Sequence, residues 1–239
     1  AMKHVLLIGV LLTTLCGRAQ PTFPFPSGDV RWTVNSVEMG SSYPSRTYAT
    51  MGDSTFNGFT YQKIGWVENT GLPFDPEDMN YSGSMRDEEG RWLFVPAGGL
   101  VEYPLFDFTG EVGDVVAIEN PYSFIGEPTE YVVQSITYLA IQNGTRRVWE
   151  LFSENPIDQQ FFIEGIGSTY GLFGHSTFLA DAGEQLICME QNSELIYRIP
   201  EAESCYIPKH CHRRHGDSAT VDSGPQSCKR GSGPWNEQS

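Results

Sequence analysis

Basic side chains are scarce in this chain, and their scarcity limits the partners it can have. Among 239 residues there are 15 Lys and Arg against 30 Asp and Glu, for a formal net charge of −15 at pH 7. Residues 21–207 hold 8 of the basic and 27 of the acidic side chains. Nucleic acids and anionic membrane surfaces are bound through cationic contacts. We therefore expect no nucleic-acid partner for this chain.

Long hydrophobic runs and helical periodicity are also missing. The apolar run at residues 5–15 is shorter than the roughly 20 residues that span a bilayer, so we expect no membrane insertion of the mature chain. Aromatic residues make up 13%, charged residues only 19%, and there are 25 Gly and 15 Pro. This composition is typical of a β-rich domain with many turns. We predict a mostly β fold, a single antiparallel meander that forms a barrel or a sandwich, because either arrangement limits exposed strand edges.

Turn signals divide the body into strands. Asn57-Gly58 and Asn143-Gly144 are two-residue hairpin turns, because both positions of a type I′ turn need positive φ. The clearest alternation of apolar residues covers residues 130–141, and a last hairpin is expected around residues 192–193. We place one β-rich domain at residues 30–207, preceded by a Pro-rich extended segment at 20–29.

The first 19 residues have the pattern of a signal peptide. Lys3 and His4 precede the apolar run, and Ala19 is a small residue at the expected cut. A lipid anchor on Cys16 is the alternative, although the residues before Cys16 lack the usual small side chain. We expect the secretion machinery as a partner and a secreted or cell-surface location.

A succession of short motifs covers most of residues 30–207. These motifs are Gly52-Asp53-Ser54-Thr55-Phe56-Asn57-Gly58, Met85-Arg86-Asp87-Glu88-Glu89-Gly90-Arg91, Leu105-Phe106-Asp107-Phe108, Asn143-Gly144 with Arg146-Arg147, Ile163-Glu164-Gly165-Ile166-Gly167-Ser168, and Leu186-Ile187-Cys188. In order and spacing they resemble an exported β-rich domain of unknown function that is common in Bacteroidetes. That resemblance implies a secreted domain, usually followed by a sorting domain for type IX secretion.

Residues 208–239 depart from this pattern. They are basic, rich in Ser, Gly and Pro, and without strand periodicity, and they hold three of the five histidines. We expect a disordered tail that is foreign to the domain. Without a sorting domain, a periplasmic location becomes the alternative.

Cysteines and histidines define two candidate sites. Cys188 and Cys205 lie 17 residues apart in an exported chain, which favours a disulfide over two buried thiols. The tail contains the soft ligands His210, Cys211, His212 and His215. Their spacing can bind zinc, but nothing fixes their geometry, so we expect adventitious binding and no resident cofactor.

Catalytic candidates are few. No Gly-x-Ser-x-Gly elbow occurs, and His175 is the only histidine between residues 20 and 207. A hydrolytic relay would therefore use His175, with Ser168 or Ser176 as nucleophile and Glu164 or Asp181 as orienting acid. Close packing around Gly165 and Gly167 is the stronger interpretation of that segment.

Acidic and aromatic residues leave further alternatives open. Two acidic runs could hold calcium or a ligand, or form solvated turns: Asp75, Glu77 and Asp78, then Asp87, Glu88 and Glu89. The tryptophans could stack on sugars but fit the core better. We predict a secreted module that binds a ligand, glycan or protein. The alternatives are a hydrolase of unfamiliar type acting on an ester or glycoside, and a structural role in the envelope.

Overall fold

The computed structural model describes residues 23–38, 41–42, 45–68, 76–122, 128–154, 159–173 and 182–205. Apart from one short 3-10 turn, η1, all regular elements among these residues are strands. The elements are β1 (Val30–Glu38), β2 (Ser41–Ser42), β3 (Arg46–Phe56), β4 (Phe59–Glu68), η1 (Pro76–Asp78), β5 (Asn80–Glu88), β6 (Arg91–Pro96), β7 (Tyr103–Asp107), β8 (Val115–Ile118), β9 (Thr129–Ile141), β10 (Gly144–Phe152), β11 (Gln159–Ile163), β12 (Gly167–Ser168), β13 (Ala182–Gln191) and β14 (Glu194–Arg198).

The strands form two antiparallel sheets. The larger sheet has the order β14-β13-β1-β3-β4-β5-β6-β7, with β2 also paired to β1, and the smaller has the order β12-β11-β10-β9-β8. Most neighbours are consecutive in sequence, and β1, the first strand, pairs with β13, the last but one. The predicted mostly β fold and its antiparallel meander are confirmed.

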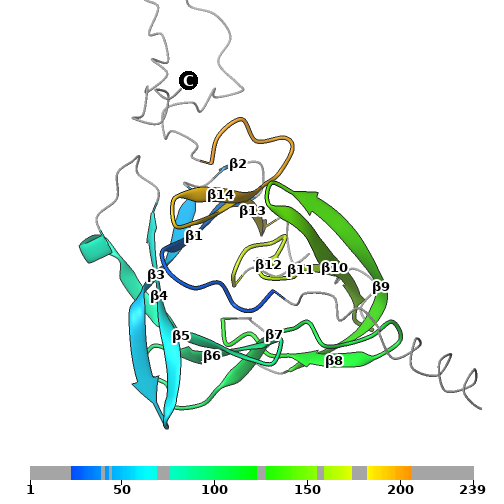
Figure 1. Cartoon of the computed structure of the whole chain (residues 1–239), viewed down its shortest axis with the longest axis horizontal. Coiled ribbons are helices and arrows are strands. Elements are labelled where there is room, and N and C mark those ends of the chain that lie inside the picture. Colours follow the sequence, from blue (N-terminus) through cyan, green and yellow to red (C-terminus); the bar gives the residue numbers. More distant parts are fainter. Residues whose placement is uncertain are drawn as a thin grey trace, which may run out of the picture.

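The two sheets curl toward each other and together make a barrel, as Figure 1 shows. At one junction, the Glu119 N–H donates to the Pro104 carbonyl across β8 and β7, with an N–O distance of 2.8 Å. At the other, the Leu186 N–H of β13 donates to the Thr169 carbonyl just after β12, also at 2.8 Å. These bonds continue the two ladders into one another, which limits the exposed edges that an open sheet would leave.

The three predicted hairpins are present, but the one between β9 and β10 turns one residue earlier than predicted. Gly144 already pairs with Ile141, so Gln142 and Asn143 form that turn and not Asn143-Gly144. Asn57 and Gly58 have φ values of 50° and 84°, which is the geometry that a two-residue turn between twisted strands requires. The last hairpin joins β13 and β14 through Asn192 and Ser193, which also have positive φ. Both turns lie where the sequence places them.

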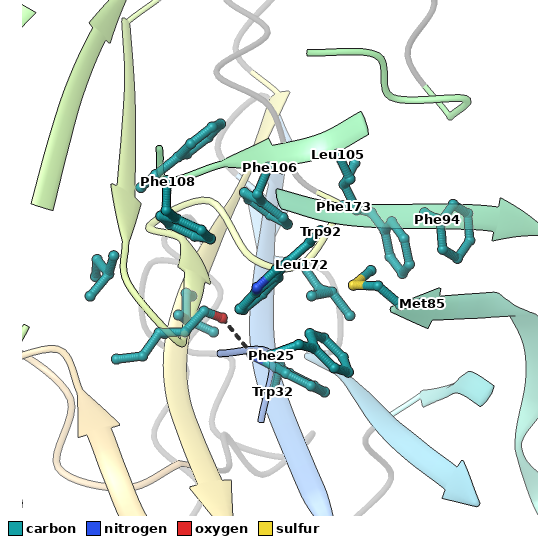
Figure 2. Close-up of a cluster of buried hydrophobic side chains, with 14 of the residues drawn as sticks. Phe25, Trp32, Met85, Trp92, Phe94, Leu105, Phe106, Phe108, Leu172 and Phe173 are labelled. Carbon is teal, nitrogen blue, oxygen red and sulfur yellow. Dashed lines mark hydrogen bonds between the residues drawn. The ribbon is translucent and has the colours of Figure 1, made fainter. Parts of the chain in front are cut away.

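Aromatic side chains fill the barrel, as Figure 2 shows. Trp32, Trp92 and Trp149 are fully buried. Phe106 meets the edge of Trp92 with ring centroids 5.2 Å apart, and Phe108 meets Trp149 at 5.3 Å. These three tryptophans therefore belong to the core and are not available as an exposed sugar platform.

A second, smaller cluster lies where the described chain ends. Cys188 and Cys205 form the predicted disulfide, with their Cα atoms 5.4 Å apart. Ile187 and Ile199 pack with Cys188 in this cluster. The bridge thereby fastens the segment after β14 to β13. No helix among the described residues is long and apolar enough to cross a membrane.

Candidate functional site

The two ends of the barrel are built differently. At one end, where the β5–β6 and β13–β14 turns lie, residues 23–29 run across the ring of strands (Figure 1). The same strands continue to the other end, which we call the distal end. The register places Arg46 of β3 and Glu68 of β4 opposite each other there.

Four aromatic rings gather toward the distal end, and we call them the distal cluster: Tyr48, Trp66, Phe173 and Tyr122. Tyr48 is the cross-strand partner of both Trp32 and Trp66, so these three side chains share one face of the sheet. The Phe173 ring lies 5.2 Å from Tyr48 and 5.3 Å from Tyr122 between centroids. The cluster thus extends the aromatic core toward solvent.

Tyr122 is the exposed member of the cluster, yet both of its ends are fixed. The residue as a whole is 52% exposed. Its hydroxyl donates to the Ser82 carbonyl at 2.7 Å, and its backbone N–H donates to Asn120 Oδ1 at 2.9 Å. Asn120 is itself buried and donates through Nδ2 to the Phe173 carbonyl at 2.7 Å. One amide side chain therefore positions two of the four rings.

Charged groups stand beside these rings. Arg46 Nη1 lies 3.8 Å from Glu184 Oε1, and the Arg46 guanidinium lies 4.9 Å from the centroid of the Trp66 ring. Burial raises the pKa of Tyr48 well above its usual range, Glu184 raises it further, and Arg46 opposes both effects. The Tyr48 hydroxyl is therefore neutral at physiological pH and able to donate.

Chemically, the distal cluster combines a half-exposed tyrosine with a guanidinium, a carboxylate and a tyrosine hydroxyl. A ring that already has a fixed orientation loses little conformational entropy when a ligand stacks on it. The Arg46–Glu184 pair is long for an ion pair. Barrel ends with a few convergent polar groups are common places for ligand binding.

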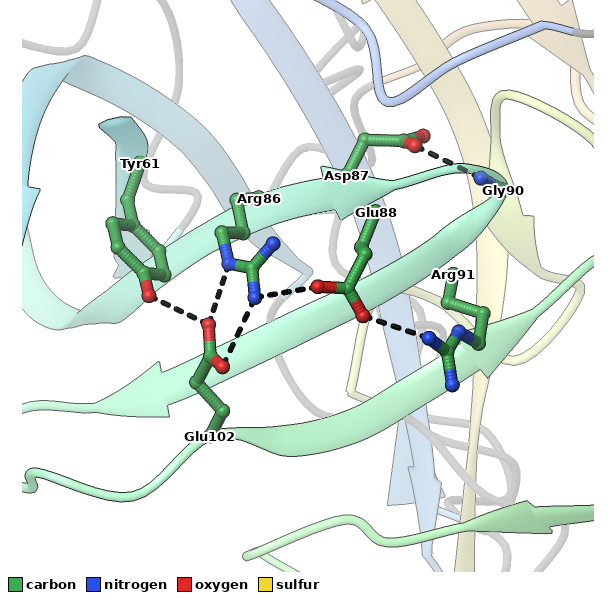
Figure 3. A network of polar contacts seen from close by, with 7 residues as sticks. All are labelled: Tyr61, Arg86, Asp87, Glu88, Gly90, Arg91 and Glu102. Carbon is green, nitrogen blue, oxygen red and sulfur yellow. Dashed lines mark hydrogen bonds and ion pairs between the residues drawn. The ribbon is translucent and has the colours of Figure 1, made fainter. Parts of the chain in front are cut away.

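A second polar network lies around β5 and is shown in Figure 3. Arg86 donates from Nε to Glu102 Oε1 at 2.6 Å and from Nη2 to Glu88 Oε1 at 3.0 Å. The Tyr61 hydroxyl donates to Glu102 Oε1 at 2.6 Å, and Arg91 Nη2 donates to Glu88 Oε2 at 2.7 Å. The pKa of Glu102 is lowered, chiefly by its hydrogen bonds from Arg86. The carboxylates of Glu88 and Glu102 are both bonded within the network. These bonds hold Glu102 against β4 and β5, which favours a structural role.

The proposed catalytic residues are only partly within the described chain. Glu164 is almost fully buried and accepts two hydrogen bonds from Arg147, at 3.1 and 2.5 Å. The Ser168 hydroxyl is buried and accepts from the Tyr170 N–H at 3.0 Å. His175, Ser176 and Asp181 lie outside the described residues. The relay stays a prediction, and in the described part its carboxylate is already engaged by an arginine.

The residues of the two acidic runs, too, lie partly outside the described chain. Asp75 lies outside the described residues, whereas Glu77 and Asp78 are exposed on η1. Asp87 caps the N–H groups of Phe25 and Gly90, at 2.8 and 2.9 Å.

Glu88 belongs to the Arg86 network, and Glu89 occupies a turn position with a φ of 55°. No group of three or more His, Cys, Asp or Glu side chains with metal-binding geometry occurs among the described residues. The tail ligands His210, Cys211, His212 and His215 lie beyond the described chain.

Sequence reasoning missed Asn120 and Tyr122. Both residues lie in the turn region after β8. The sequence around them has no alternation of apolar and polar residues, so hydrophobic periodicity could not identify them. The pair Asn120-Pro121 is a turn signal, and turn residues held by a rigid scaffold are frequent carriers of function. This turn signal is the one feature of the sequence that could have pointed to Asn120 and Tyr122.

Comparison with known proteins adds little. No protein-family model matches the sequence, and no curated protein matches it significantly. The resemblance to exported Bacteroidetes domains therefore stays a prediction. The fold shows a weak similarity to the crystal structure of a presumed lipoprotein from Parabacteroides distasonis ATCC 8503, with 11% identity and a TM-score of 0.25. The match covers 74% of this chain and 99% of the other, but a score this low supports no inference about function.

Proposed function

We propose that this chain is an exported, non-catalytic binding module whose distal cluster takes a neutral glycan. The observation that carries the proposal is Tyr122, a half-exposed residue whose hydroxyl and backbone N–H are both bonded to buried groups and whose ring packs on Phe173. An exposed ring gains little for the fold from being fixed so firmly. A fixed ring does serve a ligand that stacks on it.

The chemistry around Tyr122 fits a sugar better than a charged ligand. A pyranose ring has an apolar C–H face and an edge of hydroxyls that both donate and accept. The aromatic rings match the face, while the Arg46–Glu184 pair and the neutral Tyr48 hydroxyl match the edge. The pair contributes no net charge, and the acidic surface of residues 21–207 disfavours anionic glycans.

Screening on a glycan array, followed by calorimetry on the best hit, tests the proposal. We expect Tyr122→Ala to weaken binding by about tenfold or more, as truncation of an aromatic anchor usually does. Tyr138→Ala is the matched control, because Tyr138 is similarly exposed, at 59% against 52%, but lies on β9, outside the distal cluster. No glycan binding by the folded protein, or equal losses in the two variants, refutes the proposal.

The hydrolase alternative has less support among the described residues, because Glu164 is committed to Arg147. Its test is His175→Ala, assayed on chromogenic esters and glycosides. Wild-type activity that disappears in this variant would favour the hydrolase over the binding module. Detection of the protein in medium, periplasm or outer membrane tests the export part of the proposal and the structural alternative.

A further inference from the structure

Residues 23–29 are bound to the barrel like a separate peptide, and we call them the strap. The strap precedes β1 and takes part in no sheet. In Figure 1 it is the blue tube that crosses the ring of strands. Residues 23–28 form no rung of either ladder, and one main-chain hydrogen bond joins the strap to a hairpin where it meets β1, from the Asn192 N–H to the Asp29 carbonyl at 2.7 Å.

Side chains from several strands bond the main chain of the strap. Asp87 Oδ2 of β5 accepts from the Phe25 N–H at 2.8 Å. Gln62 Nε2 of β4 donates to the Pro26 carbonyl at 3.0 Å, and Gln191 Nε2 of β13 donates to the Ser27 carbonyl at 2.9 Å. Bonds to main-chain atoms recognise an extended backbone whatever its side chains, as in other peptide-binding domains.

Two aromatic side chains supply the selectivity. Phe25 is buried, 4.8 Å from the Trp92 ring in an edge contact and 6.1 Å from Trp32. The Phe23 ring lies under the Arg146 guanidinium, with 3.3 Å from the Arg146 Cζ to the ring centroid. Prolines at positions 24 and 26 fix φ near the extended value, which reduces the entropy lost when such a segment binds.

The groups that receive the strap are held by other bonds as well. Asp87 also accepts from the Gly90 N–H, through Oδ1 at 2.9 Å. Glu164, which accepts from the Phe23 N–H at 3.3 Å, is fixed by Arg147. These two carboxylates have partners other than the strap, which favours the same orientation in its absence.

We propose that this end of the barrel is a peptide-binding site, which the chain fills with its own strap and which takes the same kind of peptide in trans. The ligand class is an extended segment with aromatic residues at alternate positions and proline between them. This inference is independent of the glycan site, because it rests on contacts at the opposite end of the strands.

The test uses the full chain carrying Phe23→Ala and Phe25→Ala, which weakens the strap in cis. The probe is a fluorescent peptide with the sequence of residues 20–29, followed by anisotropy. We expect saturable binding to this double variant and at least about tenfold weaker binding to the wild type, whose strap competes at high effective concentration. A probe with alanine in place of Phe25 should bind about tenfold more weakly or worse. Absence of saturable binding to the folded variant, or equal binding of the two probes, overturns the proposal.

Amide hydrogen exchange on the wild type gives an answer even if the variant does not fold. A strap that detaches on its own exposes the Phe25 amide without opening the sheets. We expect that amide to exchange at least about a hundredfold faster than the Trp32 amide in the middle of β1. Equal rates would mean that the strap leaves only on global unfolding, and they would overturn the proposal.

Discussion

A buried glutamate, a buried arginine and a partly buried arginine lie together beside the strap, and charge substitutions there test the electrostatic reasoning most directly. Glu164 is 3% exposed at its side chain and Arg147 is 23% exposed. Arg146 is buried too, and among the described residues its Nε and Nη1 atoms have no hydrogen-bond partner. Burial lowers the pKa of Arg146, and Glu164 opposes that effect. One carboxylate therefore serves two guanidinium groups.

The net charge that each substitution leaves among these three residues predicts the order in which the variants lose stability. Glu164→Gln leaves the buried Arg146 and the partly buried Arg147 without an anion, so we expect it to cost about 3–5 kcal/mol, the range for breaking a buried pair. Arg147→Met leaves Glu164 with Arg146, and we expect a loss of about 1–3 kcal/mol from its two charged hydrogen bonds. Arg146→Met removes the poorly bonded cation and should lie within about 1 kcal/mol of the wild type.

Urea unfolding at pH 7 measures the series. With an m-value of about 2–3 kcal/mol/M, Glu164→Gln should lower the midpoint by about 1–2 M at unchanged m. Arg146→Met is the matched control for Arg147→Met, because the two arginines are neighbours on β10 and undergo the same substitution. An Arg146→Met variant as unstable as Glu164→Gln would refute the reasoning from net charge, since the loss would then follow from packing on Phe23.

Three further predictions concern the disulfide and two titrating groups. Replacing Cys188 and Cys205 by alanine opens a loop with a sequence separation of 17 residues and should cost about 3 kcal/mol in urea unfolding, with no effect of reductant on the variant. The raised pKa of Tyr48 gives stability that is complete below the unfolded value near 10 and is lost as pH rises above it, so Tyr48→Phe should flatten stability curves above about pH 10. The lowered pKa of Glu102 gives stability that is present above the unfolded value near 4.5 and is lost as pH falls below it. Glu102→Gln should therefore be less acid-sensitive than the wild type, and an identical pH profile would contradict the role of Arg86.

The strands and turns could be predicted because their signals are local. The residue types of Asn57-Gly58 alone favour the positive φ values of a tight turn. The alternation of apolar residues over 130–141 predicts a strand whatever the rest of the chain does. Cys188 and Cys205 were paired correctly from the oxidising compartment and their spacing. Each of these inferences needed only a short stretch of chain.

The strap could not be predicted, because its contacts reach across the chain. Phe23 bonds a residue 141 positions away and Phe25 one 62 positions away. A Pro-rich segment does not pair in a sheet. Its sequence therefore has no alternation of apolar residues from which the burial of Phe25 could be predicted. Composition predicts an extended segment, and only the folded barrel shows what the extended segment contacts.

The distal cluster escaped prediction for a related reason. Alternation tells which face of a sheet a side chain occupies, but not how far along the barrel it lies. Trp32 and Trp66 share a face, yet Trp32 is fully buried while Trp66 is only partly so. Tyr122 lies in a turn and has no alternation at all.

Trp32 lies between the two candidate sites and is the residue through which they would be coupled. Phe25 stacks on Trp32, and Trp32 is the cross-strand partner of Tyr48. A displacement of the strap could reach the distal cluster only if Trp32 moved, because coupling needs an element with two arrangements. The Trp32 indole N–H donates to the Ile166 carbonyl at 2.8 Å, and its side chain is fully buried. A close-packed ring with its one donor satisfied has no second arrangement of similar energy. We therefore expect glycan affinity in the Phe23→Ala/Phe25→Ala variant to stay within about twofold of the wild type, and a larger change would show that Trp32 is not fixed.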